Sequence, residues 1–224
     1  MSTILHIETA TKTCSVAIAD NGLLLGYKDF TGDGYTHAEN LNEFINTVLN
    51  DSGLSIENLN AIAVSGGPGS YTGLRIGTSC AKGLCFGLEI PLIEVNSLAS
   101  LGCLFNENND THKKLMPMFD ARRMEVYTQI FDSEMNQKSD IIPLVVDEKT
   151  FTELYTEDHI LFGDGADKLK PFLKEQGLGH IEIVEDFKPS ARGMIKIASE
   201  KFSNGDFVDL AYYEPNYLKE FKAG

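Results

Sequence analysis

Apolar and polar positions follow a regular order through the first half of the chain. Short runs rich in β-branched residues predict strands at 4–8, 15–20, 23–30, 61–65 and 91–95. Longer segments, in which apolar residues recur every three or four positions, predict helices at 36–50, 73–88 and 97–105. This order of elements is typical of an α/β protein, in which helices cover a sheet.

Local signals define several of these boundaries. Asn21-Gly22 is a dipeptide typical of two-residue hairpins, and it predicts that the second and third strands pair. Thr36 and Glu39 have the spacing of a capping box, in which each side chain binds the backbone N–H of the other residue. Gly53 follows the last apolar position of this helix and is expected to end it.

The second half of the chain opens as the first half does. Strands are expected at 115–119, 124–131, 141–146, 159–162 and 181–184, and helices at 150–155, 164–176 and 190–202. Glu8 and Asp120 each end the first strand of their half, before a polar turn and another strand. Two similar α/β halves predict the actin/sugar-kinase/Hsp70-like (ASKHA) fold. The polar stretch 106–114 separates an N-terminal domain, 1–108, which carries the partner-binding helices, from a C-terminal domain, 109–224.

The charge of the chain limits what it can bind directly. The chain has 19 basic and 33 acidic residues and a net charge of −14, whereas RNA binding depends on basic residues that neutralise phosphates. We therefore expect another protein to hold any RNA that this chain acts on. The four cysteines include no Cys-x-x-Cys pair and are expected to be reduced. Without a signal peptide or a membrane-length apolar run, the sequence predicts a cytoplasmic protein.

A glycine-rich loop, Gly66 to Gly73, lies between a predicted strand and a predicted helix. It lacks the Gly-Lys-Ser/Thr ending of a P-loop and the spacing of a dinucleotide-binding loop, so no cofactor is expected there. In the helix that follows, small residues recur every four positions and form a ridge that another helix can approach closely. This small-residue ridge consists of Gly73, Gly77, Ala81 and Cys85.

Two interpretations of the small-residue ridge remain open from the sequence. The ridge packs against the chain's own sheet or first helix, or it joins the apolar stripe of the first helix in contacting another protein. On the second interpretation the interface residues are Leu41, Phe44, Ile45, Val48, Gly73, Leu74, Gly77, Ala81, Leu84 and Cys85. A bulky residue at 77 or 81 would then prevent assembly without unfolding the chain.

Residues suited to catalysis are sparse. The five histidines are too far apart for a His-x-x-x-His metal motif, so neither a metal site nor a metallopeptidase is expected, and no catalytic set can be assigned. Acids at strand ends and the turns beside them suggest a vestigial nucleotide site formed by Glu8, Thr9, Asp120, Gly163, Asp164 and Gly165. The turn after Glu8 lacks glycine, which disfavours phosphate binding, and an actin-like small-molecule kinase or ATPase is the alternative function.

One motif resembles that of a known family. The segment Gly67-Pro-Gly-Ser-Tyr-Thr-Gly-Leu-Arg-Ile-Gly77, followed by Ala81-Lys-Gly83, is similar to the signature of the bacterial TsaB (YeaZ) family. Two positions depart from the family pattern, because Glu8 stands where Asp is usual and Ala10 stands where Ser or Thr is typical. Shorter segments agree over nearly the whole chain, among them His37-Ala-Glu-Asn-Leu41, Asp120-Ala-Arg-Arg-Met-Glu-Val-Tyr127, Gly163-Asp-Gly-Ala166 and Pro215-Asn-Tyr-Leu-Lys219.

The resemblance implies the ASKHA fold and a scaffold role, without catalysis, in forming N6-threonylcarbamoyladenosine at position 37 of tRNAs. It implies a heterodimer, through the first two helices, with a catalytic paralogue, TsaD, which carries the metal-binding histidines. Leu41 stands where the paralogue has its second histidine. The resemblance also implies assembly with a small ATPase, TsaE. We expect tRNA to be bound only indirectly. The sequence leaves both a monomer and a homodimer open for the chain when the paralogue is absent.

Overall fold

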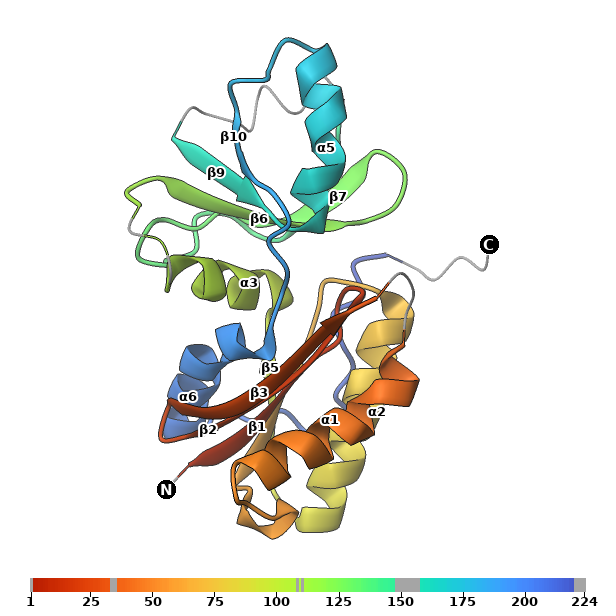
Figure 1. Ribbon diagram of the computed structural model, residues 1–224, viewed down its shortest axis with the longest axis vertical. Helices are drawn as coiled ribbons and strands as arrows, with labels where there is room; N and C mark the ends of the chain where they lie inside the picture. Colours follow the sequence, from red (N-terminus) through yellow and green to blue (C-terminus); the bar gives the residue numbers. More distant parts are fainter. Residues whose placement is uncertain (1, 33–35, 108, 110, 148–157, 220–224) are drawn as a thin grey trace. The chain divides into compact units, whose positions relative to one another are not determined.

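The computed structural model describes residues 2–32, 36–107, 109, 111–147 and 158–219. The chain divides into two compact units, the first formed by Met1–Ser100 with Pro189–Gly224 and the second by Leu101–Lys188. Each unit contains a five-stranded mixed sheet (Figure 1). In the parts of the chain that the structure describes, no helix has the length and apolar character that a membrane crossing requires.

The sheet of the first unit has the order β3-β2-β1-β4-β5. Its strands are β1 (Thr3–Glu8), β2 (Thr13–Asp20), β3 (Leu23–Thr31), β4 (Ala61–Ser65) and β5 (Leu92–Val95). The central strand β1 pairs with β2 in the antiparallel sense and with β4 in the parallel sense. Asn21 and Gly22 adopt positive φ angles of 49° and 78°, which confirms the predicted hairpin between β2 and β3.

Helices cover both faces of this sheet (Figure 1). On one face α1 (His37–Asp51) and α2 (Tyr71–Leu88) pack on side chains such as Leu5 and Ile7. On the other face a 3-10 turn, η2 (Ala191–Met194), and α6 (Ile195–Asn204) pack on Ile4. Because alternate residues of β1 enter the two cores, all six of its residues are buried.

The two predicted boundaries of α1 have different outcomes. The capping box is wrong, because Thr36 makes no side-chain cap bond and its Oγ1 instead accepts a hydrogen bond from Asn40 Nδ2 at 2.9 Å. Gly53 is confirmed as a stop signal, since it has φ of 67° just after the helix ends. A short 3-10 turn, η1 (Ile56–Asn58), leads from there to β4.

The sheet of the second unit has the order β10-β9-β6-β7-β8 and repeats the topology of the first. Its central strand β6 pairs with β7 in the antiparallel sense and with β9 in the parallel sense, as β1 pairs with β2 and β4. Helix α5 (Asp164–Glu175) packs on this sheet, and the helix predicted at 150–155 lies outside the described residues. The strands are β6 (Lys114–Asp120), β7 (Glu125–Thr128), β8 (Ile142–Val145), β9 (His159–Phe162) and β10 (Glu182–Val184).

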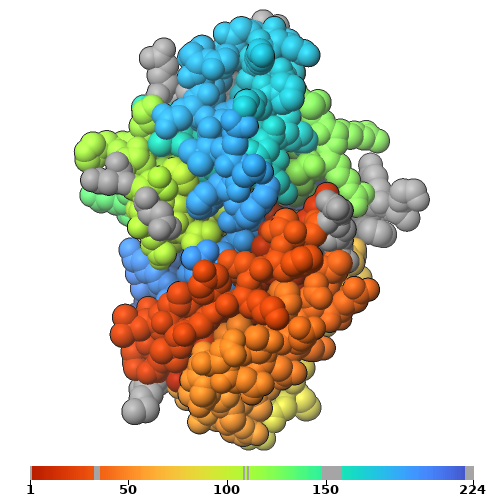
Figure 2. All heavy atoms as spheres, viewed as in Figure 1, coloured from red at the N-terminus to blue at the C-terminus, as the bar shows by residue number. Residues whose placement is uncertain are grey.

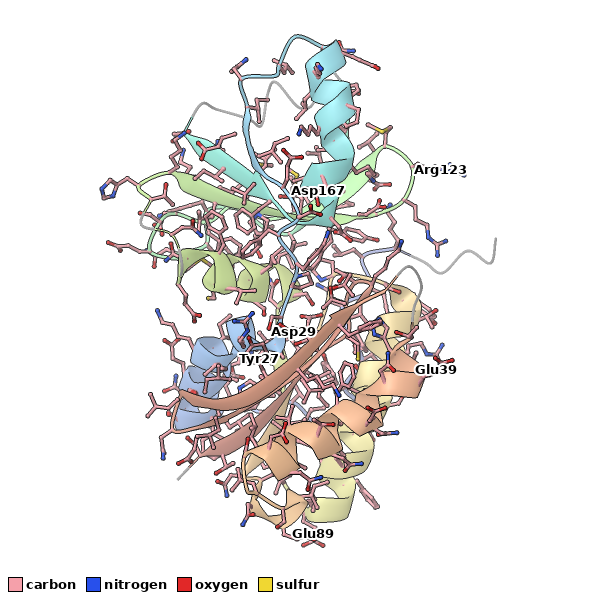
Figure 3. All side chains as sticks on the ribbon, viewed as in Figure 1. Tyr27, Asp29, Glu39, Glu89, Arg123 and Asp167 are labelled. Carbon is pink, nitrogen blue, oxygen red and sulfur yellow. The ribbon has the colours of Figure 1, made fainter. Side chains whose placement is uncertain are left out.

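The division of the chain differs from the predicted boundary at 108/109. The structure divides it within α3 (Ser97–Asn106), and 189–224 belongs to the first unit. A polar network around Asp29 of β3, labelled in Figure 3, holds this returning segment. Asp29 accepts hydrogen bonds from Ser190 and pairs with Arg192, whose guanidinium lies 4.2 Å from the centre of the Tyr27 ring. Local composition does not reveal such long-range pairing.

Candidate functional site

The glycine-rich loop before α2 uses its backbone inside the first unit. Gly66 N donates to Val95 O at 2.8 Å. Ser70 N donates to Ala10 O at 2.6 Å, and a Cβ atom at Gly69 would overlap Ala10. The loop glycines therefore allow two segments of the chain to pack closely.

The small-residue ridge of α2 also faces inward. A Cβ atom at Gly73 would overlap the Thr9 carbonyl oxygen, and one at Gly77 would overlap Thr9 Oγ1. Ala81 and Cys85 have no exposed surface and belong to the core beneath α1 and α2. These contacts support the first of the two interpretations, in which the ridge packs against the chain's own sheet. A bulky residue at 77 or 81 would therefore disturb the fold.

The other predicted interface residues are largely part of the same core. Each of the α1 residues in the set is at most 5% exposed, and Leu74 of α2 is 1% exposed, whereas Leu84 is only partly buried. Their helical spacing marks the faces that bind the sheet, so these side chains cannot form the outer surface of the helices. The buried α1 residues are Leu41, Phe44, Ile45 and Val48.

A different set of residues occupies the outer side of α2. We call Ser79, Gly83, Phe86 and Gly87 the exposed α2 stripe. Cβ atoms at Gly83 and Gly87 would have no described residue within 4 Å, and Phe86 is 80% exposed. The sequence analysis missed this stripe, although these positions fall on the side of the helix opposite the small-residue ridge when one turn is taken as 3.6 residues.

The outer face of α1 adjoins this stripe. Asn42, Glu43 and Asn46 are exposed, and Cys80 Sγ of α2 lies 3.7 Å from Asn42 Oδ1. Figure 3 labels Glu39 near the start of α1 and Glu89 just after α2, at the two ends of this helix pair. In the space-filling view α1, in orange, lies at the surface of the first unit (Figure 2).

The first part of the predicted nucleotide site is closed. Glu8 is fully buried, and its Oε1 atom accepts a hydrogen bond from Ala10 N at 2.6 Å. Burial raises the pKa of Glu8 to about 7, although hydrogen bonds from Ala10 and Ser65 oppose this shift. Thr9 is also fully buried against α2. Glu8 and Thr9 therefore support the packing between β1 and α2 and present no ligand atom to solvent.

The second part of the predicted nucleotide site lies in the second unit. Asp164 Oδ1 accepts a hydrogen bond from Asp120 N at 3.1 Å, so the structure brings these two residues together. Burial raises the pKa of Asp164. Cβ atoms at Gly163 and Gly165 would overlap Met118, so both glycines are required where α5 packs closely on β6. In the described part of the chain, no group of three or more His, Cys, Asp or Glu residues could hold a metal ion.

Comparison with known proteins places the chain in a group of tRNA-modification proteins. The family model described as "TsaD: tRNA N6-adenosine threonylcarbamoyltransferase" matches residues 34–187. The chain is 30% identical to the tRNA threonylcarbamoyladenosine biosynthesis protein TsaB of Escherichia coli over 224 residues, which cover 96% of this chain and 94% of that protein. It is 28% identical to the protein of the same name from Bacillus subtilis, covering 88% of this chain and 81% of that protein.

Solved structures agree with these sequence matches. YeaZ from Pseudomonas aeruginosa has a TM-score of 0.81 and 25% identity, covering 97% of this chain and 100% of that chain. An activator of 2-hydroxyisocaproyl-CoA dehydratase from Clostridium difficile has a TM-score of 0.55 at 9% identity, covering 93% and 99% of the two chains. This likeness and the repeated sheet topology confirm the predicted ASKHA-like fold. Taken with the family-model match and the 30% identity over nearly its full length, they show that the chain belongs to the TsaB (YeaZ) family.

Proposed function

We propose that this chain is a non-catalytic subunit in the formation of N6-threonylcarbamoyladenosine at position 37 of tRNA. It docks on a TsaD-like catalytic subunit through the exposed α2 stripe and the adjoining face of α1. The names of its relatives and the match to the TsaD family model support this role. The match to a transferase model indicates kinship with the proposed partner, and related chains commonly associate through equivalent surfaces.

The observation that carries the proposal is the pair of open glycines in α2. A glycine inside a helix is destabilising by about 1 kcal/mol relative to alanine. Among the described residues of the first unit, none requires glycine at 83 or 87, since a Cβ atom at either position would have no neighbour within 4 Å. A helix of another subunit that approaches α2 closely would require glycine at these positions. The exposed ring of Phe86 would then be buried in the contact.

The chain itself contributes no reactive centre in this scheme. Leu41, at the position of the paralogue's second histidine, is an apolar core residue. Glu8 is buried, and the loop before α2 is occupied by the chain's own packing, which weakens the alternative of a small-molecule kinase or ATPase. The catalytic subunit supplies the chemistry and most of the tRNA contact, consistent with a net charge of −14 on this chain.

The remaining parts of the assembly follow the same scheme. A TsaE-like ATPase joins the pair in the cytoplasm. The α1–α2 face also allows a homodimer when the catalytic subunit is absent, because an exposed helix pair can meet a copy of itself about a two-fold axis. Heterodimer and homodimer then compete for one surface, so adding the catalytic subunit should dissociate the homodimer.

Assembly of purified proteins tests the docking surface. The chain is mixed with the TsaD-like protein from the same genome, and binding is measured by titration calorimetry and size-exclusion chromatography. We expect Gly83→Leu and Phe86→Ser to weaken binding at least about tenfold, because one blocks close approach and the other removes a central apolar contact. Both variants should melt at or above the wild-type temperature.

Matched controls separate a specific effect from a general one. Leu23→Ser removes another exposed apolar side chain, since Leu23 is 72% exposed on β3. Gly179→Leu fills another open glycine position, in the second unit. Both controls should bind as the wild type does. Wild-type affinity in Gly83→Leu and Phe86→Ser would refute docking through this stripe.

A further inference from the structure

The hairpin between β6 and β7 ends in a strained turn that carries two arginines. Arg122 and Arg123 have φ angles of 66° and 47°, in the left-handed region that glycine and asparagine normally occupy. The cost is about 1 kcal/mol or more for each such residue. Backbone strain of this kind persists only where surrounding contacts determine it, and it often marks a functional position.

Lys168 of α5 fixes this turn. Its Nζ atom donates to Arg123 O at 2.8 Å and to Glu125 O at 2.6 Å, and it forms an ion pair with Asp120. Asp120 Oδ1 also accepts a hydrogen bond from Arg122 N at 2.8 Å. One lysine and one aspartate therefore neutralise each other while they hold the backbone of the turn, and the positive charge left at the tip comes from Arg122 and Arg123.

Both arginine side chains are exposed, and among the described residues neither guanidinium forms an ion pair or a hydrogen bond. The other two arginines of the chain are engaged. Arg75 donates to Tyr71 Oη, and Arg192 contacts Asp29 and Tyr27. Figure 3 shows Arg123 at the outer end of the hairpin. Half of the arginines in the chain are thus presented to solvent on one rigid tip.

Guanidinium groups bind anions, above all phosphates and carboxylates, through paired hydrogen bonds. The charge of the chain helps to decide between these anions. With a net charge of −14, the chain attracts basic protein surfaces, for which two arginines are unsuitable contacts. A polyanion, in contrast, is repelled over most of the surface and can approach where unpaired positive charge is concentrated.

We propose that the tip formed by Arg122 and Arg123, held by Lys168, contacts the phosphodiester backbone of tRNA directly, which revises the expectation from net charge that tRNA is bound only indirectly. The inference rests on the proposed function, in which a catalytic subunit brings tRNA to this chain. Two contacts are too few for the isolated acidic chain to bind RNA tightly at physiological salt, so the tip acts mainly within the assembled complex. The isolated chain should retain tRNA only at low salt, where phosphate contacts are strongest. There it adds affinity and fixes the orientation of the tRNA without reading its sequence.

Salt-dependent tRNA binding tests this inference on the assembled complex. Affinity for tRNA is measured by fluorescence anisotropy between 50 and 200 mM salt, a range over which phosphate contacts weaken strongly. We expect Arg122→Ala with Arg123→Ala to weaken binding roughly 10- to 50-fold at 0.1 M salt. The slope of log affinity against log salt should fall by about 1.4 to 1.8, as expected for two lost phosphate contacts.

Two further double variants sharpen the result. Arg122→Lys with Arg123→Lys should retain most of the affinity, because lysine also binds phosphate as a point charge. Lys170→Ala with Lys174→Ala removes the same charge from exposed positions of α5, and should change tRNA affinity no more than about twofold. Equal losses in the two alanine double variants would overturn the inference, because they would indicate a general charge effect.

The outcomes also separate this inference from the proposed function. An unchanged salt slope in Arg122→Ala with Arg123→Ala overturns the tRNA contact, while assembly still supports the docking proposal. Loss of assembly in that variant overturns it too, since the tip would then bind carboxylates of a subunit. If the wild-type chain does not assemble, the proposed function fails. The inference about the tip is then tested by the binding of tRNA to the isolated chain. Arginine-dependent retention of tRNA at low salt then supports the inference, and no retention overturns it.

Discussion

The two sides of α2 both carry small residues at four-residue spacing, yet they serve different purposes. On the inner side Gly73 and Gly77 allow β1 and α2 to approach so closely that any Cβ atom would overlap Thr9. On the outer side, Cβ atoms at Gly83 and Gly87 would meet none of the residues that the structure describes. The inner glycines are required for the fold of this unit. The outer glycines only weaken the helix, unless another molecule packs against it.

This contrast shows that a small-residue pattern does not identify its own partner. The inner ridge was a candidate interface in the sequence because four small residues recur in it, but its residues are buried inside the unit. The outer stripe has the same four-residue spacing at Ser79, Gly83 and Gly87, but it also includes the large side chain of Phe86. Substitutions on the two sides should therefore separate stability from assembly.

The largest effect is expected from filling the inner side. Gly77→Val would place a branched side chain against Thr9, and the chain should lose about 3 kcal/mol or more of unfolding free energy. Urea denaturation of the isolated chain measures this loss. Gly83→Val, which puts the same residue on the outer side, serves as the control and should cost less than 1 kcal/mol. Similar losses in both variants would contradict the assignment of inner and outer sides.

A pH-dependent effect is expected beneath the inner side. Burial disfavours the charged form of Glu8 and raises its folded-state pKa from the ordinary value of 4.5 to about 7. Stability from the neutral carboxyl is present below about pH 4.5 and is lost as the pH rises to about 7, by on the order of 3 kcal/mol. Glu8→Gln should remove this loss, and urea denaturation between pH 5 and 8 measures it.

Buried His6 complicates the wild-type profile. Its pKa is lowered to about 4 by burial, so its contribution to stability falls as the pH decreases from about 6.5 to 4. The two groups therefore oppose each other between about pH 4.5 and 6.5, and the difference between wild type and Glu8→Gln is the informative quantity. If that difference does not change with pH, the folded-state pKa of Glu8 is not raised.

The smallest effect is expected from replacing the outer glycines by alanine. Gly83→Ala and Gly87→Ala should each stabilise the isolated chain by about 0.5 to 1 kcal/mol, because alanine favours the helix and a Cβ atom meets no obstacle. Thermal melting detects the gain, and titration with the catalytic subunit should show weaker binding. A variant that gains stability and also keeps full affinity would show that no partner approaches these positions closely.

Much of the secondary structure could be predicted because its causes are local. Asn21-Gly22 favours the backbone angles of a tight hairpin, and Gly53 readily adopts the conformation that ends a helix. The capping box at Thr36 failed although its spacing was correct, because Asn40 binds the threonine hydroxyl. A local motif thus indicates which bonds are available and not which of them form.

The candidate site could be predicted only in part. The helices α1 and α2 were predicted close to their observed bounds, but the interface residues chosen on them were those with the clearest apolar spacing, and these face the core. Helical periodicity identifies a buried side without saying what buries it. The structure brings together Asp120 and Asp164, two residues of the predicted nucleotide site, whereas the role of Lys168 in holding the arginine turn gave no sequence signal.

By itself the sequence determined the strands, most helices, the repeated halves and the family, because these follow from local propensity, hydrophobic period and recognisable motifs. Only the tertiary structure decided which side of α2 is outside, why Glu8 is inaccessible and where 189–224 belongs. Each of these depends on contacts between residues far apart in the chain, such as Gly77 with Thr9 and Arg192 with Asp29. Such contacts are selected by the packing of the whole unit, and short stretches of sequence do not encode them separately.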